Sequence, residues 1–416
     1  MEGIFCHVPS KFHVRRSYKN FMKKLSLVAR QRLTLSLCAM AYAIIYTGRQ
    51  NLSIASPLMQ ADGITDSAGI GIMGSAFFFV YAIGRLLNGY IGDRVNARVM
   101  LMVGMGAAGI ANLVVGFMPP LPAMIVLWGV NGFFQSMLWG PALKTVVVAY
   151  EGSPEKSKAL MTMSTGVGLG SLFAVVVATL SAQAGAGAVF FIPAGLILFF
   201  GAMLIFLPPD GLRQTEEAKA DVWAQFRVIL RDPKLWRTLF PAAAHGVVKD
   251  NLILWVPTLF MTQYGLDLNN AAYFVFIMPL ANFIGRLLFP VAFRIFRSNQ
   301  GVTAAVSFAL CVVSLAPFLL LTPPAWVSAL LLAVVAIATS WINAVYLSIY
   351  SADYAKEGCV STVAGVMDAA TYTGSAIGSA AFGALILVAG YNAMIAIWIA
   401  LCVVSIPLML WKSKKA

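Results

Sequence analysis

Charged residues are scarce in this sequence. Only 11% of its 416 residues are Asp, Glu, Lys or Arg, whereas 60% are hydrophobic. A soluble globular protein could not bury that much apolar surface in one core, so this class is excluded. Apolar segments of about 20 residues, long enough to cross a bilayer, recur along the whole chain. The composition therefore predicts a polytopic membrane protein built of α-helices.

Acidic residues are the rarer charged type, with 16 Asp and Glu against 29 Lys and Arg. In a soluble chain the net charge of +13 would indicate a nucleic-acid partner. Here the basic residues gather in alternate connections, such as "GDRVNAR" and "EGSPEKSK", while "QADGITDSAG" and "SAQAGAGA" contain none. This asymmetry is the positive-inside pattern. It predicts an even number of spans, both termini in the cytoplasm, and a lipid bilayer rather than nucleic acid as the partner.

Cysteine and histidine are too few and too scattered for a disulfide framework or a metal centre. The five cysteines include no CxxC pair, and His7, His13 and His245 lack metal-ligand spacing. No nucleophile–base constellation is present either. We therefore expect no enzyme activity, no metal and no cofactor.

Twelve spans are expected, and the fold class that follows is an all-α polytopic membrane protein with two pseudo-symmetric six-helix bundles. The first bundle covers residues 32–207 and the second covers 238–411, joined by a cytoplasmic linker at 208–237 and flanked by tails at 1–31 and 412–416. The expected spans are roughly 32–58, 69–92, 98–118, 122–150, 158–182, 188–207, 238–262, 269–294, 301–321, 325–354, 360–388 and 391–411.

An internal repeat supports this division. Arg49-x-Asn51-Leu52 followed by a proline recurs 200 residues later as Lys249-x-Asn251-Leu252 followed by a proline. The string "IGRLL" occurs at 83–87 and again at 284–288. Both copies have the same orientation, as in folds whose halves pack about an axis along the membrane normal. In such folds the substrate lies between the halves near mid-membrane, so the repeat also indicates where the site is.

Arg49 and Lys249 occupy equivalent places in the first and seventh spans. Each costs about 2.5–3.5 kcal/mol at mid-membrane, which favours a functional role. Arginine binds phosphate or carboxylate through two parallel hydrogen bonds and lysine adds a point charge, so the pair predicts an anion site. Asp250 is expected to point about 100° away from Lys249 around the helix. Tyr42 and Tyr46 share the helix face of Arg49 and are expected to line the same cavity.

Two resemblances to known families follow from quoted motifs. Gly89-x3-Asp93-Arg94-x3-Arg98 resembles a loop signature of the major facilitator superfamily, and it implies a gating role for Asp93, Arg94 and Arg98. The stretches "YAIIYTGRQN", "YAIGRLLNGYIGDR", "GFFQSMLWGPALKTVV", "KDNLILWVPT" and "AGVMDAATYTGS" resemble the organophosphate:phosphate antiporters over essentially the whole chain.

The second resemblance implies exchange of an organophosphate for inorganic phosphate by rocker-switch alternating access, in a protein of the bacterial inner membrane that acts as a monomer. It implies that Arg49 and Lys249 bind the phosphate. It further implies a set of residues that shape or support the cavity, namely Tyr42, Tyr46, Tyr81, Arg85, Trp139, Lys144 and Tyr372.

Several positions depart from the family pattern. Gln50 stands where the family usually carries a lysine, and Val167 aligns with a histidine of the glycerol-3-phosphate transporters. Asp368 stands where the family usually carries a small residue. Asp368 either pairs with a lysine in a structural role or accepts a coupling proton. His245 lies one turn before Lys249 and is a second candidate for substrate contact or protonation.

Two alternative functions remain open from the sequence. One is a proton-coupled symporter of sugar acids or carboxylates, with Asp368 as proton carrier. The other is a non-transporting membrane sensor on the same fold. Counterflow of labelled phosphate would favour the antiporter, uptake driven by a pH gradient would favour the symporter, and binding without flux would favour the sensor.

Overall fold

The computed structural model describes residues 25–92, 95–209, 229, 231–354 and 360–411, and all regular secondary structure in these ranges is helical. The first half contains α2 (Leu27–Ile45), α3 (Thr47–Ala61), α4 (Ser67–Gly92), α5 (Ala97–Gly116), α6 (Leu121–Ser136), α7 (Trp139–Ala149), α8 (Lys156–Ala182), α9 (Ala188–Met203) and η1 (Leu204–Phe206). The second half contains α11 (Pro233–Tyr264), α12 (Leu268–Ile295), α13 (Gln300–Leu320), α14 (Ala325–Ala344), the π-helical η3 (Val345–Tyr350) and α15 (Val360–Leu410).

Several membrane passes consist of two consecutive helices. The pairs α2 with α3, α6 with α7, and α14 with η3 each make one pass. Conversely, α15 contains two passes, because Gly390 has φ of 71° and ψ of −176° and turns the chain back. Counted in this way, the described residues make twelve passes, and the predicted fold class is confirmed.

The two passes that carry Arg49 and Lys249 are the most polar. Nine segments of the described residues are long and apolar enough to cross a membrane by length and composition, and one of these, Thr362–Leu410, holds both passes of α15. Neither the α2–α3 pass nor α11 is among the nine. Polar passes are disfavoured against lipid, so these two suit the protein interior.

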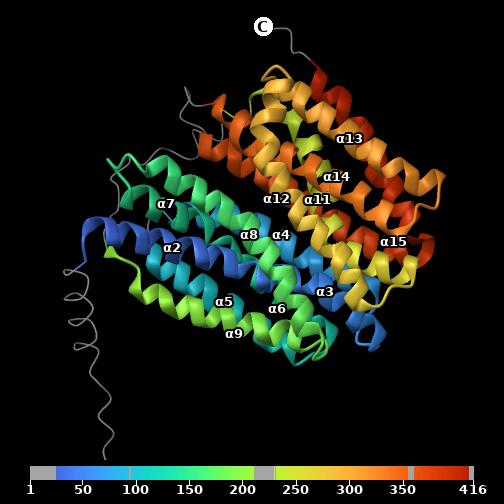
Figure 1. The fold of residues 1–416 in the computed structure, drawn as a ribbon, viewed down its shortest axis with the longest axis horizontal. Coiled ribbons are helices and arrows are strands. Elements are labelled where there is room, and N and C mark those ends of the chain that lie inside the picture. The colour runs from blue at the N-terminus through green and yellow to red at the C-terminus, as the bar shows by residue number, and fades with distance from the viewer. Residues whose placement is uncertain (1–24, 93–94, 210–228, 230, 355–359, 412–416) are drawn as a thin grey trace, which may run out of the picture.

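The two halves of the chain lie on opposite sides of the molecule. In Figure 1 the blue-to-green helices α2–α9 form one group and the yellow-to-red helices α11–α15 form the other. Most of the expected linker at 208–237, together with most of the N-terminal tail and the C-terminal tail, lies outside the described residues. The grouping agrees with the predicted pair of bundles.

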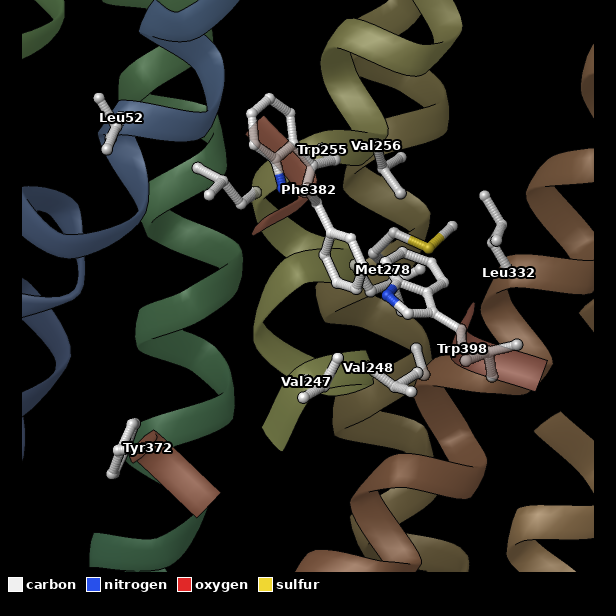
Figure 2. Close-up of a cluster of buried hydrophobic side chains, with 14 of the residues drawn as sticks. Leu52, Val247, Val248, Trp255, Val256, Met278, Leu332, Tyr372, Phe382 and Trp398 are labelled. Carbon is white, nitrogen blue, oxygen red and sulfur yellow. The ribbon is translucent and has the colours of Figure 1, made fainter. Parts of the chain in front are cut away.

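A cluster of large aromatic side chains holds α11 in the second bundle. Trp255 of α11 and Phe382 and Trp398 of α15 are each no more than 2% exposed and gather in one apolar cluster (Figure 2). The rings of Phe382 and Trp398 are 6.1 Å apart between centroids. Trp255 Nε1 donates to Asn251 Oδ1 at 3.3 Å, so the buried indole nitrogen also has a partner. This packing fixes the helix that carries Lys249.

Small residues allow α4 and α15 to approach closely across the interface between the bundles. A Cβ atom added at Gly71 would lie 2.5 Å from the Ser379 carbonyl oxygen and 2.9 Å from Gly383 Cα. Ser379 Oγ also donates to the Gly71 carbonyl oxygen at 3.0 Å. Glycine at position 71 is therefore a steric requirement of this contact.

We expect Gly71→Ala to lower the thermal unfolding midpoint of the purified protein, because overpacking a tight contact costs about 1–3 kcal/mol. Gly106→Ala is the matched control, since a Cβ at that α5 position meets no atom within 4 Å. Differential scanning fluorimetry in detergent checks both variants. Equal midpoints for the two would contradict the close contact between the bundles.

Candidate anion-binding site between the two bundles

Arg49 lies in the first turn of α3, where the first pass is interrupted. The carbonyl oxygen of the preceding residue, Gly48, accepts three hydrogen bonds from buried side-chain amides. The donors are Asn131 Nδ2 at 2.9 Å, Gln135 Nε2 at 3.0 Å and Asn112 Nδ2 at 3.3 Å. These bonds anchor the turn that carries Arg49 at a depth where water cannot replace them.

Sequence reasoning missed these three amides. Asn112 lies in the apolar helix α5, and Asn131 and Gln135 lie in the apolar helix α6, spaced so that they share one helix face. A buried amide must form hydrogen bonds, so an amide in an apolar pass indicates that a buried polar partner lies close to it. What the sequence lacked was the identity of the shared acceptor.

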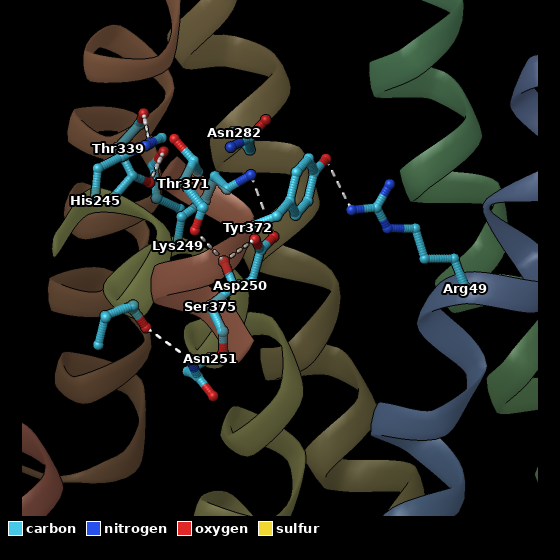
Figure 3. Close-up of polar contacts among 12 residues, drawn as sticks. Arg49, His245, Lys249, Asp250, Asn251, Asn282, Thr339, Thr371, Tyr372 and Ser375 are labelled. Carbon is cyan, nitrogen blue, oxygen red and sulfur yellow. Dashed lines mark hydrogen bonds and ion pairs between the residues drawn. The ribbon is translucent and has the colours of Figure 1, made fainter. Parts of the chain in front are cut away.

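The Arg49 guanidinium reaches across to the second bundle. Its Nη2 donates to the hydroxyl of Tyr372 on α15 at 3.0 Å (Figure 3). Its Cζ lies within cation–π range of four ring centroids, which are Tyr81 at 4.8 Å, Tyr372 at 5.3 Å, Phe77 at 5.5 Å and Tyr46 at 5.7 Å. None of the ion pairs found among the described residues involves Arg49. Aromatic faces and one hydroxyl therefore stabilise this cation in place of a carboxylate.

Lys249 approaches the same tyrosine from the opposite side. Its Nζ lies 5.1 Å from the centroid of the Tyr372 ring. The same Nζ is 3.3 Å from Asp250 Oδ1, and the other oxygen of Asp250 accepts from Ser375 Oγ at 2.6 Å. Arg49 and Lys249, one from each bundle, thus lie against one ring (Figure 3).

The expectation that Asp250 turns away from Lys249 was wrong. Their Cβ atoms do diverge around the helix, but the long lysine side chain bends back to the carboxylate. The separation of 3.3 Å is longer than the 2.7–2.9 Å typical of a charge-assisted hydrogen bond. Lys249 is thus partly neutralised, which the sequence-based hypothesis of two free cations did not include.

A cavity of about 40 Å³ lies beside Arg49. Polar groups from both bundles reach it, including Arg49, Gln50 and Asp250, and apolar walls complete it. The remaining lining residues are Leu52, Ser53, Gly74, Phe77, Phe78, Trp128, Ile253 and Leu254. The volume corresponds to a few water-sized spheres, so a larger guest requires these walls to move apart.

Arg85 and Asp368 form an ion pair between the bundles. Arg85 on α4 donates to Asp368 Oδ2 on α15 from Nη2 at 2.5 Å and from Nε at 3.0 Å. The side chains are 21% and 9% exposed. The carboxylate was expected to pair with a lysine or to carry a proton, and its partner is instead this arginine. Neither residue is among those that line the cavity.

Of the other predicted aromatic residues, Tyr46 and Tyr81 contact Arg49, Tyr42 packs next to Tyr46 and Trp139, and none of the four lines the cavity. The rings of Tyr42 and Trp139 lie 4.7 Å apart and those of Tyr42 and Tyr46 lie 5.8 Å apart, between centroids. The ring of Tyr81 lies 4.5 Å from that of Tyr372 across the interface. The structure thus brings these tyrosines into one group around Arg49.

His245 is buried one turn before Lys249 and is 1% exposed. Its Nε2 lies 2.9 Å from the Thr339 carbonyl oxygen on α14 (Figure 3). It does not line the cavity beside Arg49.

The predicted gating residues are only partly described. Asp93 and Arg94 lie outside the described residues. Arg98 Nη2 donates to the carbonyl oxygen of Leu207 in the same bundle. A gating role for these three residues stays a prediction.

Comparison with known families agrees with this geometry. Residues 38–372 match the family model described as the Major Facilitator Superfamily. The chain belongs to this superfamily. Among solved structures it is similar to the nucleoside transporter NupG, with a TM-score of 0.73 at 14% identity over 91% of this chain and 97% of that one. This second likeness concerns the fold alone.

Sequence identity is higher with several curated relatives than with this solved structure. The chain is 27% identical to the membrane sensor protein UhpC of Escherichia coli over 286 residues, which is 63% of this chain and 64% of that protein. It is 24% identical to the glycerol-3-phosphate transporter of Bacillus subtilis over 285 residues, which is 62% of this chain and 64% of that protein. It is 28% identical to a hexose phosphate transport protein of Chlamydia trachomatis over 208 residues, covering 50% and 44%. The matches thus span less than two thirds of these relatives.

The ion pair between the bundles predicts energetic coupling between its two residues. We expect Asp368→Asn and Arg85→Gln each to destabilise the protein, and the double variant to be about 1–3 kcal/mol less destabilised than their sum. A double-mutant cycle on the free energy of unfolding in detergent measures this coupling.

The exposed pair of Lys234 and Asp353, whose side chains are 39% and 41% exposed, is the control. An exposed pair contributes about 0.2–1 kcal/mol, so its cycle should show little coupling. Additive effects at Arg85 and Asp368 would refute the buried pair.

Proposed function

We propose that this member of the superfamily transports a small organic anion, a phosphate monoester in exchange for inorganic phosphate, by alternating access. One observation carries the proposal. Arg49 of the first bundle and Lys249 of the second lie against opposite sides of Tyr372, next to a cavity that both bundles line. A site that both bundles share is what a carrier needs if it is to expose its cargo to each side in turn.

The two cations suit a phosphate group in different ways. The guanidinium of Arg49 offers a fork of N–H donors that matches two phosphate oxygens, and the ammonium of Lys249 adds a mobile charge. Both groups now use Tyr372 as a partner, so the anion takes the place of the tyrosine hydroxyl at Arg49. The anion also competes with Asp250 for Lys249.

The same cations account for exchange. Two positive charges at about 10 Å repel each other by ~1.7 kcal/mol when the effective dielectric constant is near 20, and Asp250 beside Lys249 reduces this repulsion without abolishing it. A bridging anion converts this repulsion into attraction between the bundles. The carrier then crosses its closed state mainly with cargo bound, so outward and inward movement are tied together. The names of the relatives, a glycerol-3-phosphate transporter and a hexose phosphate transport protein, support this cargo class.

We expect Arg49→Ala to abolish exchange in reconstituted vesicles, and Arg49→Lys to retain at most about a tenth of it, because lysine keeps the charge but loses the fork. Counterflow of labelled phosphate against glycerol 3-phosphate or glucose 6-phosphate measures both variants. Arg32→Ala, at an exposed position of α2, is the control and should exchange normally. Full exchange by Arg49→Ala would rule out this site.

One observation favours a second candidate, a symporter of monocarboxylates. Asp250 lies beside Lys249 and, with Arg49, lines the cavity, so the charges of Arg49, Lys249 and Asp250 sum to +1 rather than +2. A monoanion such as a sugar acid would neutralise this charge alone. Uptake of labelled galactonate driven by a pH gradient, without internal phosphate, would favour the symporter. Binding of either anion without flux would favour a sensor.

A further inference from the structure

His245 is a buried titratable group with one free ring nitrogen. Nε2 lies 2.9 Å from the Thr339 carbonyl oxygen. A carbonyl oxygen only accepts hydrogen bonds, so Nε2 must carry a proton. Nδ1 of the neutral ring is then a lone-pair acceptor, and no described group forms a hydrogen bond with it. A buried acceptor without a partner is unusual in a native core.

The neighbours of His245 connect it to the anion site. On α11 itself, Lys249 follows one turn later, with Asp250 next to it. On η3 the ring of Tyr346 lies 6.0 Å away between centroids, and on α15 Tyr372 lies against Lys249. Asp250, Lys249 and Tyr372 lead from His245 to Arg49 in Figure 3. The imidazole thus lies one helical turn from Lys249, on the side of Lys249 that faces away from Arg49.

Two charged side chains on the other helices packed near α11 already have hydrogen-bond partners of their own. Asp368 of α15 is held by Arg85 through two hydrogen bonds to one oxygen. Arg286 of α12 donates to Asn282 at 3.1 Å. The charged groups that act electrostatically on His245 among the described residues are Lys249 and Asp250.

The charge balance of the loaded site indicates that Nδ1 of His245 binds a proton. Arg49, Lys249 and Asp250 sum to +1, and a phosphate monoester above pH 7 carries close to −2. The loaded site would then hold an uncompensated negative charge inside the membrane, which is costly. One proton on His245 brings the loaded cluster to zero. The anion in turn screens Lys249, which otherwise opposes a second positive charge beside it.

We propose that His245 binds one proton together with each phosphate-ester dianion and carries it across the membrane with the cargo. This inference rests on the proposed function, since it assumes phosphate esters as cargo. The proton comes from solvent, binds Nδ1 and leaves with the anion on the other side. Exchange of two such dianions then moves no net charge and no net proton.

The geometry points to His245 rather than Asp368 as the proton site. The Asp368 carboxylate already neutralises Arg85, so a proton on it would remove the negative charge of this ion pair and leave the Arg85 guanidinium without compensation. The His245 Nδ1 accepts a proton without breaking any bond that the described residues make. The two candidates named from the sequence are thereby distinguished.

Calorimetry on the intact protein counts the proton directly. Binding of glycerol 3-phosphate at pH 8 is measured in two buffers with different ionisation enthalpies, and the difference in heat gives the protons taken up per anion. We expect about one proton per anion for the wild-type protein. Between pH 7 and 8.5 the affinity should fall as pH rises, by up to roughly tenfold per unit, because the loaded state holds one proton more.

Two variants assign the proton to a residue. His245→Gln keeps an N–H donor for the Thr339 carbonyl but cannot take up a proton in this range, so it should bind with no uptake and no pH dependence. Asp368→Asn tests the other candidate proton site; it lowers the stability of the protein because Arg85 loses its partner, but the folded variant should keep both the uptake and the pH dependence. If His245→Gln fails to fold, His245→Asn, which also offers an N–H donor and takes up no proton in this range, replaces it in the same measurement.

Each outcome separates the two proposals. Binding without proton uptake in the wild-type protein overturns the inference about His245 and leaves the proposed function standing. Loss of uptake in Asp368→Asn, or its persistence in His245→Gln, assigns the proton elsewhere and also overturns the inference. Failure of the wild-type protein to bind any phosphate ester overturns both proposals.

Discussion

Two basic side chains must remain charged inside an apolar protein, and the rest of the site is arranged around this requirement. Arg49 is stabilised by four aromatic rings and one tyrosine hydroxyl, and Lys249 by the neighbouring carboxylate of Asp250. Tyr372 contacts both cations and comes from the second bundle. The protein thereby holds a net positive charge at the interface without burying a fully unpaired cation.

The duplicated halves treat equivalent positions differently. Arg85 and Arg286 occupy the same place in the two "IGRLL" repeats, yet the first pairs with Asp368 of the opposite bundle and the second bonds to Asn282 of its own helix. Likewise Gly48, before Arg49, is held by three amides, while Lys249 is held through Asp250 and Ser375. The internal repeat gives the two bundles the same arrangement of helices, and the side-chain differences give equivalent positions different interactions.

Prediction from the sequence succeeded where the signal is a sum over many residues. Hydropathy identified the passes, because each requires about 20 apolar residues, and the repeat identified Arg49 and Lys249 as partners. Prediction failed where a single side chain has several possible interaction partners. Asp250 was expected to turn away, Asp368 was expected to pair with a lysine or to accept a proton, and the amides around Gly48 were not noticed. Spacing along a helix sets where a Cβ lies but leaves the end of a long side chain free.

The sequence by itself therefore determined the class of this protein, its twelve passes, its two-fold repeat and the positions of its central cations. These follow from the cost of exposing polar groups to lipid, which acts on every residue of a span. Only the tertiary structure decided which group neutralises which. It placed Tyr372 between Arg49 and Lys249, Arg85 against Asp368, and His245 beside Lys249 with one ring nitrogen that no described group bonds. Such pairings depend on distances of a few ångströms between helices far apart in the chain, and no local pattern encodes them.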